Sequence, residues 1–253
     1  AQFHVGAQVK GHGGCPVFDA RLEADAAAQP HGAVGSRRHV VHVPDAGIGR
    51  KDGDGAVGVA SEIGLFTMGA SGLVEVSDPG GVFISGRDAA APGSCVVPAL
   101  EGNRCLLVEV QALVNRSDLP QPTRRVSGCD PNRVAMVLAV LSRRMRLPLG
   151  GCDVFVNVTG GARIEEPAAD LGIALAITSA LRDEAVPQDL VALGEVGLGG
   201  ELRPAPRYEL RATEARRLGF QRLLGPGGGS GRGRLVSTSL AAALSQVWPV
   251  AAG

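Results

Sequence analysis

Apolar and polar residues follow the periods of strands and helices from Ser61 onward. Residues 105–113 and 153–158 alternate between the two kinds, which is the pattern of a half-buried strand. At Asp130-Pro131 an N-capping carboxylate precedes a proline, and the apolar stripe that follows predicts a helix. Further strands are expected at 62–68, 190–196 and 222–225, and further helices from about 167 to 181, at 208–218 and at 238–248. Strands that alternate with helices predict an α/β fold.

Residues 1–58 lack this periodicity. They contain one leucine, one isoleucine, eleven glycines and all five histidines. Little apolar material is present to offset the entropy of ordering the chain, so we expect this segment to be the least ordered part. One short strand is expected at about 40–43, and the irregular spacing of the histidines argues against a metal site.

The composition fits a protein with a sizeable aliphatic core, because 45% of the 253 residues are hydrophobic and only 3% are aromatic. The net charge is zero, which gives no overall attraction to nucleic acid. No apolar run is long enough to span a bilayer and no signal peptide is recognisable, so we expect a cytoplasmic protein without a membrane partner.

The cysteines show no Cys-x-x-Cys pair and their number is odd. We therefore interpret them as small buried apolar residues in a reducing compartment, and not as zinc ligands or a disulfide framework. They are Cys15, Cys95, Cys105, Cys129 and Cys152.

Arginines are the best candidates for binding, since eight of them stand against three glutamates between Glu201 and Arg234. Guanidinium groups on such a strip can neutralise backbone phosphates without reading bases. The alternative is a solvated face, or pairing with carboxylates across a subunit boundary. The DNA-binding candidates are Arg124, Arg125, Arg203, Arg207, Arg211, Arg216 and Arg217.

Glu165, Glu166 and Asp170 stand together where the second helix begins. They could act as acid–base catalysts, but we favour stabilisation of the positive end of the helix. Gly160-Gly161 is interpreted as a tight turn and not as a phosphate cradle. The chain contains no P-loop motif, so no nucleotide site of that type is expected.

Two motifs resemble the Lon-type serine–lysine protease domain. One begins at Thr159 and reads Thr-Gly-Gly-Ala-Arg-Ile-Glu-Glu-Pro-Ala-Ala-Asp-Leu; the other begins at Gly194 and reads Gly-Glu-Val-Gly-Leu-Gly-Gly-Glu-Leu-Arg-Pro. The resemblance places Ala168 at the nucleophile position and Glu209 at the lysine position. A methyl group cannot attack a carbonyl and a carboxylate cannot replace a desolvated lysine, so no catalytic residue is expected.

Further blocks make the chain similar to the C-terminal part of the RadA (Sms) family of bacterial recombination and repair proteins. They include Ser-Glu-Ile-Gly-Leu-Phe at 61–66, Pro-Thr-Arg-Arg at 122–125 and Gly-Glu-Val-Gly-Leu at 194–198. The resemblance divides the chain into a poorly patterned segment or remnant of a RecA-like core (1–58), a connector with a strand from the end of that core (59–90), and a Lon-protease-like domain (91–250).

The resemblance implies DNA recombination and repair, in which a non-proteolytic Lon-like domain helps to build a hexameric ring and contacts DNA during branch migration. The implied partners are single-stranded or branched DNA, further copies of the chain, and RecA recombinase. ATP, Mg and Zn are implied for the full-length family, but none is expected in this chain.

One family motif is missing: where Lys-Asn-Arg-Phe-Gly would precede Ser61, the chain reads Asp54-Gly55-Ala56-Val57-Gly58. ATP-coupled work on DNA is therefore in question. Two other interpretations stay open. The chain could be a Lon-type serine peptidase, which Ala168 and Glu209 disfavour, or a non-functional truncated remnant.

Overall fold

A computed structural model describes residues 90–227 and 232–249, residues 81–84, 86 and 88, and five short strands before them. These strands are β1 (Gly6–Ala7), β2 (Ala20–Arg21), β3 (Arg38–His42), β4 (Ile63–Gly69) and β5 (Gly72–Glu75). β1 pairs with β2, and β3, β4 and β5 form an antiparallel sheet. β3 and β4 confirm the strands expected at about 40–43 and at 62–68. The rest of residues 1–58 lies outside the described residues, so their poor order stays a prediction.

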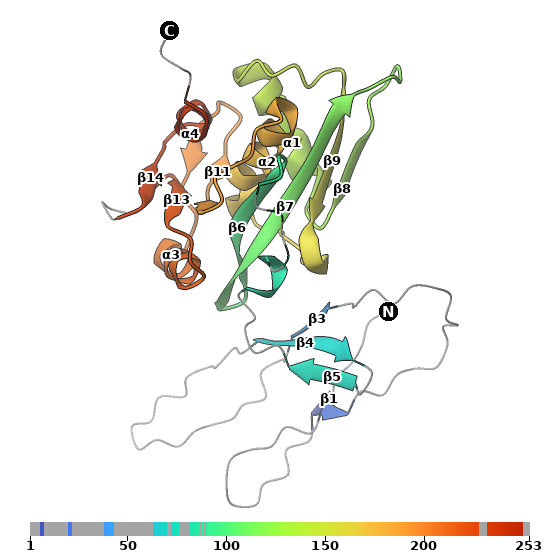
Figure 1. Cartoon of the computed structure of the whole chain (residues 1–253), viewed down its shortest axis with the longest axis vertical. Coiled ribbons are helices and arrows are strands. Elements are labelled where there is room, and N and C mark those ends of the chain that lie inside the picture. Colours follow the sequence, from blue (N-terminus) through green and yellow to red (C-terminus); the bar gives the residue numbers. More distant parts are fainter. Residues whose placement is uncertain are drawn as a thin grey trace, which may run out of the picture.

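The remaining elements build an α/β body (Figure 1). Its strands are β6 (Ser94–Glu101), β7 (Arg104–Arg116), β8 (Arg124–Ser127), β9 (Cys152–Val158), β10 (Leu190–Ala192), β11 (Glu195–Val196), β12 (Leu202–Arg203), β13 (Arg222–Gly225) and β14 (Arg234–Val236). Its α-helices are α1 (Pro131–Arg144), α2 (Asp170–Arg182), α3 (Tyr208–Arg217) and α4 (Leu240–Val247). Three short 3-10 helices are η1 (Val82–Ile84), η2 (Thr159–Gly161) and η3 (Pro167–Ala169).

Seven of these strands form one mixed sheet in the order β14-β13-β10-β6-β7-β9-β8. The strands from β14 to β6 run parallel, β7 is antiparallel to both of its neighbours, and β8 is parallel to β9. β11 and β12 make a separate antiparallel ribbon. The α/β class expected from the sequence is confirmed.

Successive residues of the central strands point to opposite faces of the sheet, and this divides the core in two. Val97 and Val110 pack in the larger cluster, to which α1, α2 and α4 contribute. Val96 and Leu107 pack in a smaller cluster beneath α3. α3 covers only part of its face, because Leu113 and Phe155 further along the sheet are 62% and 37% exposed.

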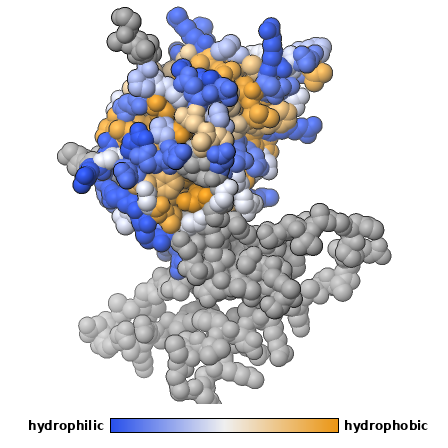
Figure 2. All heavy atoms as spheres, viewed as in Figure 1, coloured by the Kyte–Doolittle hydropathy of each residue, from blue (hydrophilic) through white to orange (hydrophobic). Residues whose placement is uncertain are grey.

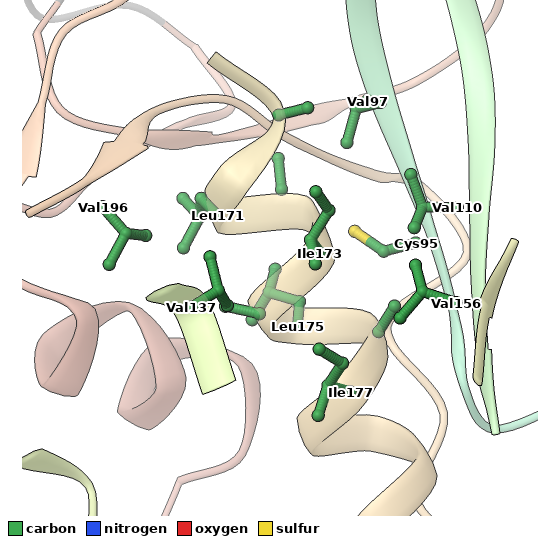
Figure 3. Packing of buried hydrophobic residues seen from close by; sticks show 14 of the residues in the cluster. Cys95, Val97, Val110, Val137, Val156, Leu171, Ile173, Leu175, Ile177 and Val196 are labelled. Carbon is green, nitrogen blue, oxygen red and sulfur yellow. The ribbon is translucent and has the colours of Figure 1, made fainter. Parts of the chain in front are cut away.

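α2 lies against β6 at a distance that glycine alone permits. The helix is buried from Asp170 to Ser179, and Figure 3 shows Leu171, Ile173, Leu175 and Ile177 within the core. A Cβ atom placed on Gly172 would come within 2.0 Å of the Cγ1 atom of Val97. The missing side chain therefore sets how closely the helix packs on the sheet.

Several elements differ from the sequence prediction. β6, β8 and β14 were not expected, and Arg124 and Arg125 lie at the start of β8. The strand expected at 190–196 divides at Gly194, whose N–H donates to the Ala168 carbonyl at 2.8 Å and so leaves the sheet.

No disulfide joins the cysteines in the described part of the chain. Cys95 and Cys105 are buried, as expected, whereas Cys129 and Cys152 are only partly buried. Burial raises the pKa of the Cys105 thiol to about 12 and that of Cys129 to about 11. Both are therefore protonated and weakly nucleophilic at neutral pH. Cys15 lies outside the described residues.

The described residues contain no cluster of three or more side chains of the kinds that hold a metal ion. None of their helices combines the length and the hydrophobicity needed to cross a membrane.

Replacing Gly172 by Ala should lower the free energy of unfolding by about 1–3 kcal/mol, because the new methyl group overlaps a stiff β-branched side chain in a packed core. This loss exceeds the roughly 1 kcal/mol that alanine gains over glycine within a helix. Urea unfolding measures the change. Gly151→Ala is the matched control, since a Cβ there meets no atom within 4 Å. Equal stability of the Gly172 variant and the native chain would contradict the packing argument.

Candidate functional site

The segment 166–171 lies between the two halves of the core, at the place of the expected dyad nucleophile. Ala168 is 4% exposed and packs beneath α3, whereas Ala169 packs with α2 on the other side. The Gly194 carbonyl accepts from the Leu171 N–H at 3.0 Å, next to the bond from Gly194 to Ala168. These two bonds hold the segment against the end of β10.

Pro98 marks the place where the ladder between β6 and β10 stops. Val96 of β6 is bridged to Val191 of β10, and the next residue facing that side, Pro98, has no N–H to continue the ladder. Beyond Val96, two side chains bind the backbone groups of β6 in place of β10. The Pro98 carbonyl accepts from the Arg211 guanidinium, and the Leu100 N–H donates to the Glu166 carboxylate at 2.8 Å.

Arg211 and Glu166 form an ion pair at this edge of β6. The Arg211 side chain is fully buried, and its guanidinium donates to both oxygens of Glu166, with 2.7 Å from Nη1 to Oε1. Its Nε also donates to the Pro206 carbonyl at 3.0 Å. A buried guanidinium has to be paired in this way. Arg211 therefore cannot reach a phosphate, which corrects its inclusion among the DNA-binding candidates.

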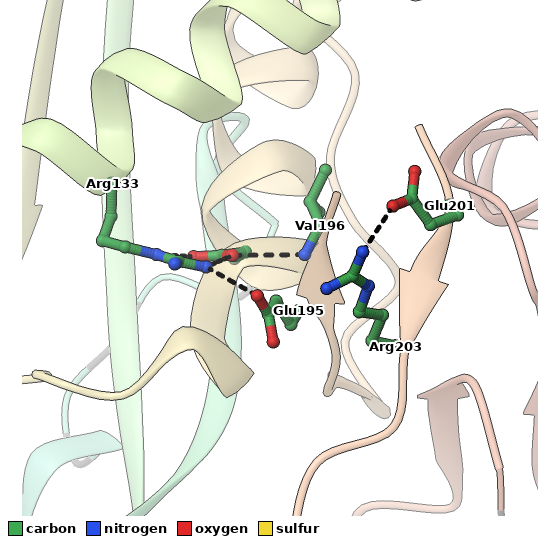
Figure 4. Close-up of polar contacts among 6 residues, drawn as sticks. Arg133, Glu195, Val196, Glu201 and Arg203 are labelled. Carbon is green, nitrogen blue, oxygen red and sulfur yellow. Dashed lines mark hydrogen bonds and ion pairs between the residues drawn. The ribbon is translucent and has the colours of Figure 1, made fainter. Parts of the chain in front are cut away.

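Asp170, at the other end of η3, is 2% exposed and bound by Arg133 of α1 (Figure 4). Arg133 Nε donates to Asp170 Oδ1 at 3.2 Å, and the Val196 N–H donates to Oδ2 at 3.1 Å. Burial raises the pKa of the Asp170 carboxyl, while these hydrogen bonds act in the opposite direction. Glu195 approaches the same guanidinium at 3.8 Å.

The acidic residues at the start of α2 therefore serve mainly to bind arginines. Glu166 and Asp170 are held by α3 and α1, and Glu165 is exposed. These ion pairs support a structural and not a catalytic role for the acidic cluster. They add to the stabilisation of the positive end of the helix that the sequence predicts. Sequence reasoning missed Arg133. A cation in the first turn of a helix opposes the dipole, and this was a signal that it has a carboxylate partner.

Glu209, at the expected lysine position, lies on the surface with a 70% exposed side chain. It accepts from Arg234 at 2.7 and 2.8 Å, and that guanidinium lies 4.9 Å from the centre of the Tyr208 ring. Ser179 is buried and bonded to the Gly93 N–H and the Glu184 carbonyl. Lys10 and Lys51 lie outside the described residues, so the described part holds no serine–lysine pair.

The other arginine candidates differ in how far they are neutralised. Arg203 pairs with Glu201 at 3.1 Å and Arg217 with Glu214 at 2.8 Å, whereas Arg207 donates to the Gly102 carbonyl and to Asn103. Arg124, Arg125 and Arg216 are exposed, and among the described residues none of the three has an ion-pair partner.

Gly160 and Gly161 have φ of 70° and 75°, which confirms the tight turn. A Cβ on Gly161 would meet no atom within 4 Å. The left-handed backbone, and not a close approach, is therefore what requires glycine at this position.

Arg211→Met should lower the free energy of unfolding by about 3 kcal/mol or more, because it leaves the Glu166 carboxylate and the carbonyls of Pro98 and Pro206 without their partner. Arg203→Met is the control, since its exposed pair with Glu201 contributes about 1 kcal/mol or less. Chemical denaturation of both variants gives the comparison. Similar losses in the two would show that the buried pair has no special role.

Comparison with known proteins gives two kinds of match. Residues 133–228 match the family model described as subunit ChlI of Mg-chelatase. Curated relatives carry the name DNA repair protein RadA. The chain is 48% identical to the one from Escherichia coli strain K12 over 169 residues, which are 67% of this chain and 37% of the relative.

Two other relatives give the same result. Identity is 42% over 174 residues to RadA from Synechocystis, covering 69% of this chain and 34% of the relative. It is 47% over 169 residues to RadA from Aquifex aeolicus, covering 67% and 38%. The chain thus spans little more than a third of the length of these relatives. The resemblance seen in the sequence motifs is confirmed, and over the matched residues this chain is of the RadA type.

Proposed function

We propose that this chain acts in DNA repair as a RadA-type protein, and that residues 91–250 form a non-proteolytic Lon-type domain within it. The observation that carries the proposal is the 48% identity over 169 residues to a protein named for DNA repair. The sheet that begins at Ser94 and the helix that ends at Val247 fit these domain bounds.

The chemistry at the expected dyad supports the non-proteolytic assignment. Ala168 brings only a methyl group, and its carbonyl is used to bind Gly194. Glu209 is exposed and already paired with Arg234. A nucleophile and a desolvated base are both missing, so a peptidase reaction has no group to begin it. No bound ATP, Mg or Zn is part of the proposal for this chain.

The exposed arginines support sequence-independent contact with DNA backbone phosphates. The proposal also includes assembly with further copies of the chain into a hexameric ring, a role in branch migration, and RecA recombinase as a further partner. These properties are what the RadA resemblance implies.

The purified chain should not cleave fluorescently labelled casein. The double variant Ala168→Ser with Glu209→Lys should be inactive as well, because the new lysine would stand in water beside Arg234 and keep an ordinary ammonium pKa. The native Lon-type peptidases of any bacterium provide the positive control. Cleavage by the native chain that a serine reagent abolishes would overturn the proposal. Cleavage by the double variant alone would show that only side chains are missing.

The chain should bind single-stranded oligonucleotides of different sequence with similar affinity. Arg216→Ala with Arg217→Ala should make the plot of log affinity against log salt less steep by about 0.7, which is the contribution of one phosphate contact. One contact and not two is expected because Glu214 already neutralises Arg217. Fluorescence anisotropy at several salt concentrations measures the slope. Arg182→Ala with Arg203→Ala is the matched control, because it removes two arginines that are both held by carboxylates. Dissociation of an oligomer in light scattering, with the slope unchanged, would assign these arginines to assembly instead.

A further inference from the structure

Several chain segments meet at one end of the seven-stranded sheet. β7 ends there at Arg116, which is in register with Cys152 at the start of β9. β8 begins there, because it runs parallel to β9 with Arg124 opposite Val154. α1 ends at Arg144 and is joined to β9 by residues 145–151. Figure 1 shows the tip of β7 and the adjacent strands β8 and β9 at this end. We call it the basic end.

The basic end carries an excess of exposed positive charge. The acidic residues on segments 113–125 and 142–155 are Asp118 and Asp153, two carboxylates against six arginines. Asp153 is occupied by the Thr123 N–H at 2.6 Å, and this bond lowers its pKa. The six arginines, all exposed, are Arg116, Arg124, Arg125, Arg143, Arg144 and Arg146.

The strip around α3 is much closer to neutral. Its five arginines from Arg203 to Arg217 stand beside Glu201, Glu209 and Glu214 on the same segment, and Glu166 reaches in from η3. Three of the five are in ion pairs. At the basic end, the partners of Arg124 and Arg144 among the described residues are the neutral carbonyls of Leu149 and Leu198. The charge that an anion would meet is therefore larger at the basic end.

The helix dipole accounts for only part of this cluster. Arg143 and Arg144 lie in the last turn of α1, where cations are favourable. Arg146 lies beyond the C-cap with φ of 56°, a left-handed conformation that glycine adopts without strain. Neither the dipole nor the backbone gives a reason for a long cationic side chain at that position. A role in binding does.

Apolar side chains border Arg125 on the uncovered face of the sheet. Phe155 of β9, which is 37% exposed, has Arg125 of β8 and Leu113 of β7 as its register partners. Figure 2 shows hydrophobic and hydrophilic side chains next to one another along the upper rim of the molecule. An aromatic ring beside a guanidinium group can bind a nucleotide of a single strand, because the ring stacks on the unpaired base and the guanidinium group binds the phosphate.

We propose that the basic end binds the backbone of single-stranded nucleic acid, with Phe155 as a stacking surface, and that it is the main nucleic-acid contact of this chain. The inference rests on the proposed function in DNA repair and moves the contact from α3 to the other end of the molecule. It gives a role to Arg116, Arg143, Arg144 and Arg146, which were not among the sequence candidates.

The test compares two double variants with the same change in charge. Arg143→Ala with Arg146→Ala should weaken binding of a single-stranded oligonucleotide about tenfold or more and lower the salt slope by about 1.4, the value of two phosphate contacts. The matched control is again Arg182→Ala with Arg203→Ala, which should leave the slope unchanged. Arg143→Lys with Arg146→Lys should keep the slope, because phosphate neutralisation needs charge. Circular dichroism confirms folding of each variant.

Phe155→Ala tests the preference for unpaired bases. It should weaken binding of the single strand about fivefold or more without changing the salt slope, and should leave binding of a duplex of the same length unchanged. Equal loss for single strand and duplex would overturn the stacking role. Circular dichroism again separates this loss from unfolding.

The remaining outcomes distinguish failure of the proposed function from failure of the inference about the basic end. If the native chain binds no oligonucleotide, both fail. If it binds, and the slope falls with Arg216→Ala and Arg217→Ala but not with the Arg143 and Arg146 variant, the inference fails and the proposed function stands. If that variant only dissociates an oligomer in light scattering, the basic end holds copies of the chain together and the inference fails.

Discussion

The short segment between Glu166 and Asp170 depends on two carboxylates that are bound by arginines from different helices. Asp170 is bound by Arg133 of α1, and Glu166 by Arg211 of α3. Because α1 and α3 lie in the two separate halves of the core, the segment links both layers. Removing one arginine would leave a largely buried charge unpaired and remove a contact between a helix and this segment at the same time.

The same pairs account for the surroundings of Ala168, the expected nucleophile position. At the end of β6 the missing N–H of Pro98 leaves a gap in the hydrogen-bond ladder, and Arg211 and Glu166 fill it. Ala168 lies between the two bound carboxylates and is buried. The site is thus closed by structural contacts, while Glu209 is held outside by Arg234. In this arrangement the expected dyad positions contribute to packing and surface pairing and have no means of attacking a substrate.

Much of the fold could be predicted from local signals. The Asp130 side chain accepts from the Asn132 N–H at 2.9 Å as an N-cap, and β9 shows the alternating burial that its sequence indicated. β6 escaped prediction because its apolar residues run without alternation and include Pro98, which is rare inside a sheet. Its burial on both faces accounts for the missing polar positions.

The candidate site was harder to predict because its partners are far apart in sequence. Arg211 and Glu166 are separated by 45 residues, and no local pattern links them. One signal was present: Arg211 and Ala215 stand one turn apart on the buried face of α3. Alanine on that face indicates close packing against the sheet, and it argues that Arg211 points inward. Charge alone had grouped Arg211 with its exposed neighbours.

The two outermost strands of the large sheet are short, and both carry arginine. β8 has four residues and begins with Arg124 and Arg125, and β14 has three and begins with Arg234. An unpaired strand edge is a template on which another chain can add. β14 opposes this addition through its shortness, because Arg234 is paired with Glu209, whereas β8 opposes it through its shortness and through charge repulsion between identical copies. Sheet extension from one molecule to the next is therefore disfavoured. The arrangement protects a valine-rich sheet from aggregation, and it leaves helices and sheet faces as the surfaces through which copies could associate in an ordered way.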